Sequence, residues 1–203
     1  MKVQQFKNKL LSSNSYILYF EKNNCVWVID PGDSGPLLDW IKSKNKTLKG
    51  ILLTHSHADH TYGINELIKH FPKAKKYSSF LSVEAFKSEK LNGSLYMEIP
   101  FTIDSEDFTF VSEGDEIFLW DKLSIKVFET PGHSNDCLSF KIGSFLFTGD
   151  ALIPQKKVYT RSKTGDKNKA ESTISRIIST FNSDTIVCPG HGKICTLLES
   201  LRS

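Results

Sequence analysis

The sequence lacks several features that would place the protein outside ordinary globular proteins. No run of about 18 apolar residues is present, so no membrane-spanning helix is expected. The amino terminus, MKVQQFKNKLL, has no apolar segment or small-residue cleavage site of a secretory signal. The four cysteines form no CxxC pair, which favours reduced cysteines over a disulfide framework. These absences predict a cytoplasmic protein.

Excess charge of one sign is also lacking. The formal net charge is +3, which is too small to indicate a nucleic-acid partner by itself. Lysines gather loosely at 42–49, 69–76 and 156–169, and we interpret these groups as solvated faces and loops. The composition is 39% apolar and 24% charged, which is typical of a globular protein, and 203 residues suit one domain with a sizeable core or at most two small ones. We therefore expect a single domain over residues 1–203, while its oligomeric state stays unknown.

Short strand-like runs come in two groups, with helical patterns between and after them. We expect strands at 15–20, 25–29, 50–54, 108–111, 116–120, 123–129, 137–142, 145–148 and 185–188. Helical spacing of apolar residues predicts helices at 36–42, 64–71, 80–89 and 170–181. Residues 90–107 have no clear pattern and are interpreted as a loop or flap. This order predicts an α+β architecture of mixed sheets covered by helices.

Histidine is scarce, and five of the six histidines lie in three short segments that each follow a strand-like run. The segments are THSHADH at 54–60, TPGH at 130–133 and PGHG at 189–192, and FTGD at 147–150 ends another strand with a carboxylate. Strands of one sheet can deliver their end loops to one edge, so residues far apart in the chain can meet there. His70, in a lysine-rich helical segment, is interpreted as a surface residue.

These side chains are suitable ligands for zinc and similar divalent ions. The candidate ligands are His55, His57, Asp59, His60, His133, Asp150 and His191. A tetrahedral ion uses about four ligands, so this set fits two ions that share Asp150 as a bridge. Two such ions, about 3.5–4 Å apart, lower the pKa of bound water and stabilise an oxyanion. The set therefore indicates hydrolysis without a Ser or Cys nucleophile.

Three neighbouring residues support this interpretation. Gly132 and Gly190 immediately precede His133 and His191, where they let the backbone turn sharply. Asp30, in the sequence Asp-Pro-Gly, is interpreted as a turn residue that hydrogen-bonds a ligand loop.

The motifs resemble those of the metallo-β-lactamase superfamily of hydrolases. They are Asp30-Pro31-Gly32, THSHADH at 54–60, TPGH at 130–133, TGD at 148–150 and PGHG at 189–192, in the order of that family and over nearly the whole chain. The resemblance implies the αβ/βα four-layer sandwich. In that fold two mixed β-sheets are flanked by helices, and the metals lie at one edge between the sheets.

The resemblance also implies a role for each ligand. His55, His57 and His133 match the first metal site, Asp59, His60 and His191 match the second, and Asp150 matches the bridge. It implies two divalent metal ions, with zinc expected and iron or manganese as alternatives, and a hydroxide between them as the nucleophile. Asp59 and Asp150 are the catalytic candidates, and Asp59 is expected to orient the water or shuttle a proton.

Within the superfamily, the chain resembles the small glyoxalase II-like (hydroxyacylglutathione hydrolase-like) group, which hydrolyses thioesters such as S-lactoylglutathione. Glyoxalase II proper has an extra C-terminal helical domain with glutathione contacts, whereas this chain ends soon after 189–192. We therefore expect a small thioester, ester or lactone substrate and leave glutathione open. In such relatives the stretch after the bridging aspartate lines the pocket. Here Lys156, Tyr159 and Arg161 are candidates for binding a substrate carboxylate, and an exposed basic loop is the alternative.

The sequence leaves three other functions as alternatives. β-Lactamases are less favoured, because their best-known branch has a cysteine at the place of Asp150 and is exported. Persulfide dioxygenases resemble this family and use one iron held by two His and one Asp, for which His57, His133 and Asp150 are available. A non-catalytic, zinc-stabilised binding module is the last alternative. In each enzymatic case we expect a small-molecule substrate and neither a nucleic-acid nor a membrane partner.

Overall fold

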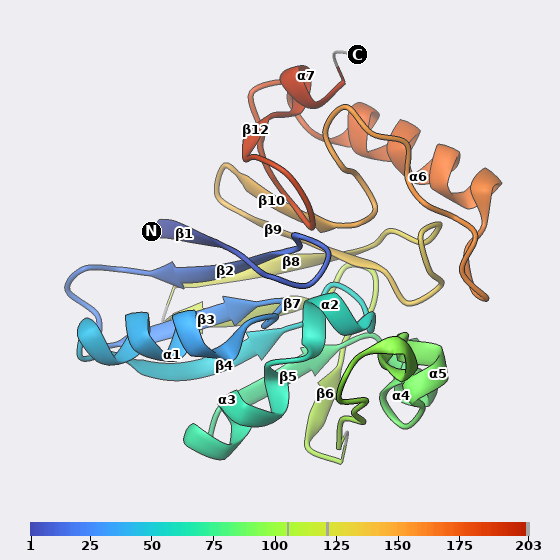
Figure 1. Cartoon of the computed structure of the whole chain (residues 1–203). Helices are drawn as coiled ribbons and strands as arrows, with labels where there is room; N and C mark the ends of the chain where they lie inside the picture. The colour runs from blue at the N-terminus through green and yellow to red at the C-terminus, as the bar shows by residue number, and fades with distance from the viewer. Residues whose placement is uncertain (105, 121, 202–203) are drawn as a thin grey trace. The chain divides into compact units, whose positions relative to one another are not determined.

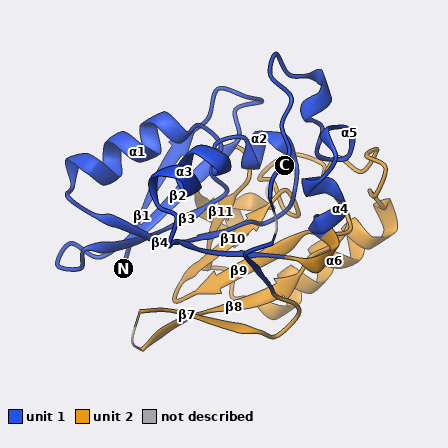
Figure 2. Cartoon of the chain, turned by 90° about the horizontal axis from the view of Figure 1, so that it is seen from below, with its two compact units in different colours: residues 1–78, 82–110 blue, residues 79–81, 111–203 orange. Residues whose placement is uncertain are grey.

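The computed structural model describes residues 1–104, 106–120 and 122–201. The protein divides into two compact units (Figure 2). Unit 1 comprises residues 1–78 and 82–110, and unit 2 comprises residues 79–81 and 111–203. Each unit carries one six-stranded sheet. The expectation of a single domain over residues 1–203 stays a prediction.

The sheet of unit 1 follows chain order from its first strand to its last. Its strands are β1 (Lys2–Lys7), β2 (Asn14–Tyr19), β3 (Cys25–Ile29), β4 (Thr47–Leu52), β5 (Lys75–Ser78) and β6 (Phe108–Phe110). The pairs from β1 to β3 are antiparallel, and those from β3 to β6 are parallel. The sheet is therefore mixed. Because Ile29 lies opposite Leu52, the residues that follow β3 and β4 leave the sheet side by side.

Helices cover one face of this sheet (Figure 1). The helices of unit 1 are α1 (Ser34–Ser43), α2 (Ala58–Thr61), α3 (Ile64–His70), α4 (Val83–Phe86) and α5 (Glu89–Asn92), and the 3₁₀ turn η2 (Ser94–Tyr96) follows α5. A second 3₁₀ turn, η1 (Phe80–Ser82), directly precedes α4 in the chain, and its first two residues belong to unit 2. Apolar side chains at helical spacing, such as Leu37 and Ile41 of α1, are fully buried and share one core with Val28 and Ile51 of the strands. This core holds α1 and α3, the helices before and after α2 in the chain, on the sheet.

The sheet of unit 2 also follows chain order. Its strands are β7 (Glu116–Trp120), β8 (Leu123–Glu129), β9 (Leu138–Ile142), β10 (Phe145–Gly149), β11 (Ile186–Pro189) and β12 (Cys195–Thr196). β10 and β11 are parallel, and the other pairs are antiparallel. Since β8 and β10 both run against β9, the carboxyl ends of β8, β10 and β11 lie at one edge of the sheet.

Two helices belong to unit 2, α6 (Lys167–Thr180) and α7 (Leu197–Ser200). Asp166 is the N-cap of α6, and its side chain accepts a hydrogen bond from Lys169 N at 3.0 Å. Its buried Ile177 shares a core with Leu146 of β10 and Val187 of β11. α6 is thereby packed on the strands that lead to two of the candidate ligands.

Most expected elements are present, and the differences are local. The single helix predicted over 80–89 is wrong, because this stretch forms the short pieces η1, α4 and the start of α5. In the stretch 90–107, residues 97–104 and 106–107 form a loop, as expected, whereas residues up to 96 belong to α5 and η2. The loop is anchored to unit 1, since Ile103 is buried in its core and the Ile103 N–H donates to Phe86 O at 2.8 Å. Strands β1, β5 and β12 and helix α7 were not predicted.

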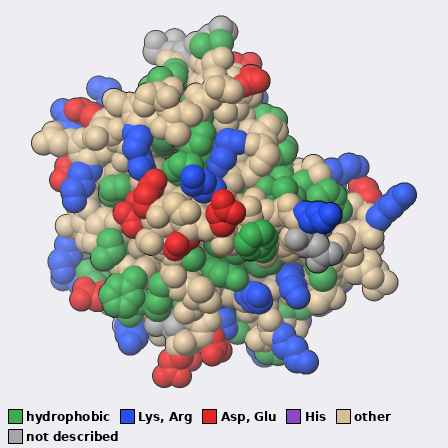
Figure 3. Space-filling view, turned by 180° about the vertical axis from the view of Figure 1, so that it is seen from behind, with side chains coloured by type: hydrophobic (Ala, Val, Ile, Leu, Met, Phe, Trp, Pro, Cys, Tyr) green, Lys and Arg blue, Asp and Glu red, His purple; other side chains and the backbone are tan. Residues whose placement is uncertain are grey.

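Most lysines of the three groups are exposed, as expected, but Lys76 is only 5% exposed and pairs with Asp107 at 3.3 Å. Figure 3 shows one face on which lysine and arginine side chains stand among acidic and hydrophobic groups. On that face the cations form no continuous band of the kind that binds a polyanion. Among the described residues, no helix has the length and apolar character needed to cross a membrane.

Candidate metal centre

Unit 1 gathers four candidate ligands at the carboxyl end of β4. His55 and His57 precede α2, with His57 as its N-cap, and Asp59 and His60 lie within it. The ring centroid of His55 is 4.8 Å from that of His57 and 4.4 Å from that of His60. His60 Nε2 lies 3.3 Å from Asp59 Oδ2. These short distances bring the donor atoms close together. Three of the four side chains, those of His55, Asp59 and His60, are also buried.

A buried carboxylate, Asp30, orients two of these histidines. It follows β3 and accepts hydrogen bonds from Thr54 N at 2.7 Å and from Thr54 Oγ1 at 2.6 Å. Because the hydroxyl of Thr54 gives its hydrogen to Asp30, it accepts from His55 Nδ1, which lies 3.0 Å away. His60 Nδ1 lies 3.2 Å from Asp30 Oδ2 and donates to it. Both rings are thus left with Nε2 as the atom that can bind a metal ion.

The donor atoms of Asp30, His55 and His60 also lie within 4.8 Å of one another, which would itself allow a metal ion there. We assign Asp30 a supporting role instead, because both of its oxygens already accept hydrogen bonds. The interpretation of Asp30 as a turn residue that hydrogen-bonds a ligand loop is confirmed.

The turn beside α2 leaves no room for additional atoms. A Cβ on Gly63 would lie 2.0 Å from the carbonyl oxygen of Gly32, and a Cβ on Gly32 would lie 2.1 Å from Asn8 Nδ2. Ser13 Oγ donates to the carbonyl oxygen of Asp59 at 2.6 Å. This packing fixes the backbone of α2 against the turn that follows β3.

Unit 2 brings its three candidate ligands around one oxygen atom. Asp150 Oδ2 lies 3.5 Å from His133 Nε2 and 3.4 Å from His191 Nε2. The three residues follow β8, β10 and β11, whose carboxyl ends share one edge of the sheet. Gly190 N donates to Gly149 O at 2.7 Å, which joins the ends of β10 and β11. The convergence therefore follows from the topology of this sheet.

Main-chain contacts set the orientation of His133. Its Nδ1 donates to the carbonyl oxygen of Tyr159 at 2.7 Å, which leaves Nε2 directed at Asp150. The preceding Gly132 has φ +146°, and a Cβ there would lie 2.4 Å from Ala170 Cα of α6. The expected glycine turn is thus present before His133. Beside His191 the residue with positive φ is Gly192, at +90°.

The three candidate substrate-binding residues lie on the segment between β10 and α6. Lys156, Tyr159 and Arg161 are exposed. The ring centroid of Tyr159 is 6.3 Å from that of His133. The tyrosine is therefore beside a candidate ligand, and a substrate-binding role for the three residues stays a prediction.

The remaining titratable candidates have ordinary structural roles. All four cysteines are free thiols, which confirms the expectation of no disulfide. Burial raises the pKa of the Cys137 thiol, with a smaller contribution from the charge of Asp136, and burial likewise raises the pKa of Cys188. His70 is exposed, which confirms its interpretation as a surface residue, and its Nδ1 lies 3.2 Å from Glu66 Oε1 one helical turn away.

Sequence reasoning missed the residues that hold the ligands. Thr54 joins Asp30 to His55, and its place directly before HSHADH was the signal available. The backbone acceptor for His133 had no signal, because any residue at position 159 supplies a carbonyl oxygen.

The donor sets fit divalent metal ions by their chemistry. Each unit combines imidazole nitrogen with carboxylate oxygen, the donors that zinc, iron and manganese bind. Three of the five candidate histidines, His55, His60 and His133, have a hydrogen-bond partner that directs Nε2 to the ligand cluster. Metal ions held by such groups would lower the pKa of water and stabilise negative charge on oxygen.

Comparison with known proteins gives consistent relatives. The family described as the metallo-beta-lactamase superfamily matches residues 8–191. A hydroxyacylglutathione hydrolase of Buchnera aphidicola (subsp. Acyrthosiphon pisum, strain APS) is 32% identical over 188 residues, which is 91% of this chain and 64% of that protein. This chain spans only 48% of the length of two further curated relatives of that name.

Solved structures share the fold. The BLEG-1 B3 metallo-beta-lactamase has a TM-score of 0.90 and 27% identity, with 98% of this chain and 96% of that chain covered. ETHE1 from Myxococcus xanthus has a TM-score of 0.77 and 24% identity, with 100% and 82% covered. The predicted fold class, two mixed sheets flanked by helices, is confirmed.

Proposed function

Because the chain belongs to the metallo-β-lactamase superfamily, we propose that it is a metal-dependent hydrolase with two divalent ions, zinc being the first candidate. The proposed ligands are His55, His57 and His133 for one ion, Asp59, His60 and His191 for the other, and Asp150 for both.

The observation that carries the proposal is that the candidate ligands within each unit are buried and held in a defined orientation. In unit 2, two imidazole Nε2 atoms flank one oxygen of Asp150 at 3.4 and 3.5 Å. In unit 1, the rings of His55 and His60 are fully buried and hydrogen-bonded through Nδ1. Such buried and oriented groups are suited to hold a cation with little rearrangement.

The ions, when bound, would supply Lewis acidity that lowers the pKa of water and stabilises an oxyanion. The protein residues would do the rest. Asp59, whose carboxylate lies 3.3 Å from His60 Nε2, would orient the attacking water and hold its proton. Asp150 would keep the two sites at a fixed separation. Asp30 and the carbonyl of Tyr159 would hold the imidazole rings in place.

The proposed substrate is a small thioester, ester or lactone. The support is the similarity to proteins named hydroxyacylglutathione hydrolase, of which this chain spans only part. Lys156, Tyr159 and Arg161, on the exposed segment after β10, are the proposed contacts to a substrate carboxylate. A glutathione moiety in the substrate is left to experiment.

Metal analysis and one pair of variants test the proposal. Untagged protein should contain close to two equivalents of a divalent metal, and a panel of thioesters, esters, lactones and β-lactams should reveal turnover. Asp150→Ala should lower kcat/KM by more than about 100-fold, beyond the loss that an outer partner of a metal ligand causes. Asp39→Ala, on the exposed face of α1, is the matched control and should keep full activity. Full turnover by the Asp150 variant contradicts the bridge.

The same measurements separate the alternatives. One equivalent of iron, with oxygen uptake in the presence of a persulfide, would indicate a dioxygenase that uses His57, His133 and Asp150. A protein that unfolds on metal removal and turns over no compound in the panel would indicate a zinc-stabilised binding module.

A further inference from the structure

The loop that carries His133 is held by its own backbone oxygens. Three successive carbonyls, those of residues 131–133, each accept a hydrogen bond from residues 162–173, which comprise the segment before α6 and the first half of that helix. Thr173 Oγ1 donates to the first at 2.7 Å, Asp166 N to the second at 2.8 Å, and Ser162 Oγ to the third at 2.9 Å. The donors run in the opposite direction along the chain, so the two segments are matched along their length.

The loop is also pressed against α6 itself. Gly132 has no space for a Cβ, because Ala170 Cα would be only 2.4 Å away. Thr173 lies one turn further along the helix and is 5% exposed. The hydrogen bond from Thr173 to the Pro131 carbonyl is part-buried, and a carbonyl that loses such a donor must find water or move.

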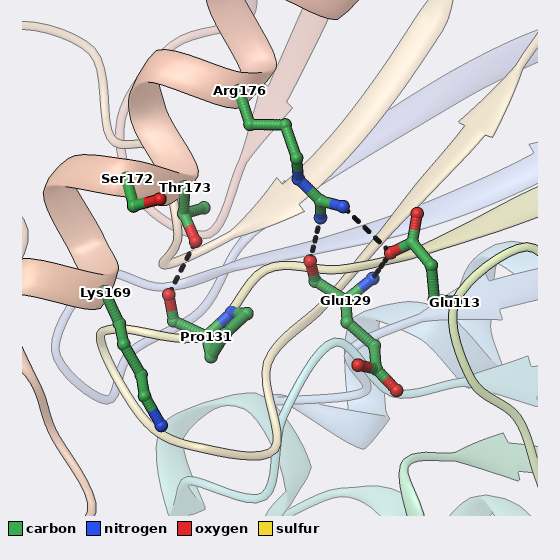
Figure 4. A pocket seen from close by; sticks show the side chains of 7 residues that line it. All are labelled: Glu113, Glu129, Pro131, Lys169, Ser172, Thr173 and Arg176. Atoms are coloured by element: carbon green, nitrogen blue, oxygen red, sulfur yellow. Dashed lines mark hydrogen bonds and ion pairs between the residues drawn. The ribbon is translucent and has the colours of Figure 1, made fainter.

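Figure 4 shows how Thr173 meets this loop. Its hydroxyl points at the carbonyl of Pro131 at one side of a cavity of about 290 Å³. On the other side, Arg176 of the same helix donates to the carbonyl of Glu129, the last residue of β8, and pairs with Glu113 at 3.1 Å. α6 therefore holds the chain both where β8 ends and where the ligand loop begins.

We propose that Thr173 is a positioning residue for His133 and thereby sets the affinity of one of the metal ions. The inference rests on the proposed function in that His133 is taken as a ligand. The distance from His133 Nε2 to Asp150 Oδ2, 3.5 Å, depends on where the loop backbone lies. The Thr173 hydroxyl fixes that backbone two residues before the ring, so its loss lets the imidazole shift relative to the carboxylate.

A packing role for Thr173 makes the opposite prediction. Valine has nearly the shape of threonine but no hydroxyl, whereas serine keeps the hydroxyl and loses the methyl group. If Thr173 only fills space in the core of unit 2, Thr173→Val is neutral and Thr173→Ser is harmful. If the hydroxyl positions His133, Thr173→Val is harmful and Thr173→Ser is close to wild type.

The test is a metal-affinity measurement on the full chain, with Zn²⁺ in competition with a chromophoric chelator and with Co²⁺ followed by its visible absorption. We expect Thr173→Val to lower the affinity for one of the two ions by about 10-fold and to change the Co²⁺ absorption of that site alone. Thr173→Ser should keep the wild-type affinity and the wild-type Co²⁺ absorption. Thr180→Val, at the exposed end of the same helix, is the control and should leave both unchanged.

The outcomes separate the two hypotheses. If Thr173→Val binds both ions with wild-type affinity while Thr173→Ser binds one ion more weakly, the positioning role is overturned and the proposed function stays intact. Wild-type protein that binds neither Zn²⁺ nor Co²⁺ overturns both. If Thr173→Val does not fold, Ser162→Ala is the second variant. It removes the hydroxyl that donates to the carbonyl of His133, and it should lower the affinity for the same ion.

Discussion

The two units hold their candidate ligands by different means. In unit 1, four ligands come from six consecutive residues, and a side-chain carboxylate, Asp30, orients two of their rings. In unit 2, three ligands come from three separate strand ends, and the orientation of His133 depends on backbone carbonyls. In unit 1 the orientation of the rings depends on side chains, so a point substitution can remove it. In unit 2 the orientation of His133 depends on a main-chain carbonyl, which a side-chain replacement at position 159 leaves in place.

The largest effect should come from changing the main-chain path in unit 2. Gly132→Ala adds a Cβ that meets α6 and takes an unfavourable φ, so we expect a loss of roughly 2–5 kcal/mol in the free energy of unfolding. Gly192→Ala has an unfavourable φ but open space, so only about 1–2 kcal/mol should be lost. Urea unfolding of the metal-free proteins measures the difference. Equal losses would mean that contact with α6 does not constrain the loop.

The next effect should come from the carboxylate in unit 1. Asparagine tolerates the φ of +51° at position 30, but its amide nitrogen cannot accept a hydrogen bond, whereas Oδ1 of Asp30 accepts from Thr54 N and Oδ2 accepts from Thr54 Oγ1 and His60 Nδ1. Asp30→Asn therefore loses one side of this network. We expect metal affinity to fall by about 10–100-fold. Tyr159→Phe should keep wild-type affinity, because the acceptor for His133 is a carbonyl. Chelator competition checks both, and a similar loss in the Tyr159 variant would remove the contrast between the units.

The smallest effect should appear at high pH in the support of unit 1. Tyr62 donates to Asp33 Oδ1 at 2.5 Å, and burial, followed by this bond, raises the pKa of its hydroxyl. A raised folded pKa means that the stability is present below the unfolded value near 10 and is lost as pH rises above it. Tyr62→Phe should therefore cost about 1–2 kcal/mol at neutral pH, and the gap to wild type should shrink above pH ~10.

Unfolding curves of the metal-free proteins at several pH values measure this gap. Tyr96→Phe, at an exposed site, is the matched control and should follow wild type at every pH. A gap that is constant across the pH range would contradict the assigned hydrogen bond to Asp33.

The sequence predicted best what is local. β3, β7 and β8 have the expected bounds, because their apolar residues stand between clear turns. The ligands at 55–60 were evident because they are adjacent in the chain. β1, by contrast, has two half-buried glutamines between exposed terminal lysines, and β5 begins with two lysines, of which the first is exposed and the second buried, so their pattern is weak. The stretch 80–89 has helical composition, yet it is interrupted at Ser88, which caps α5.

Long-range support was beyond prediction for a physical reason. Thr173 and Pro131 are 42 positions apart, and their contact joins a hydroxyl to a main-chain carbonyl. Such an acceptor carries no residue signature, since nearly every residue offers one. The sequence therefore identified candidate ligands but not what holds them, except at Asp30, where the supporting group is itself a side chain.

The contact of Gly63 with Gly32, and of Gly32 with Asn8, has a consequence for directed evolution. A single methyl group at either glycine would strike its neighbour at 2.0 or 2.1 Å, so the three positions can drift only as a linked set. A mutant library meant to alter which compounds this protein accepts should keep those three codons constant. It should place its diversity at exposed positions in 155–161, which carry the proposed contacts to the substrate.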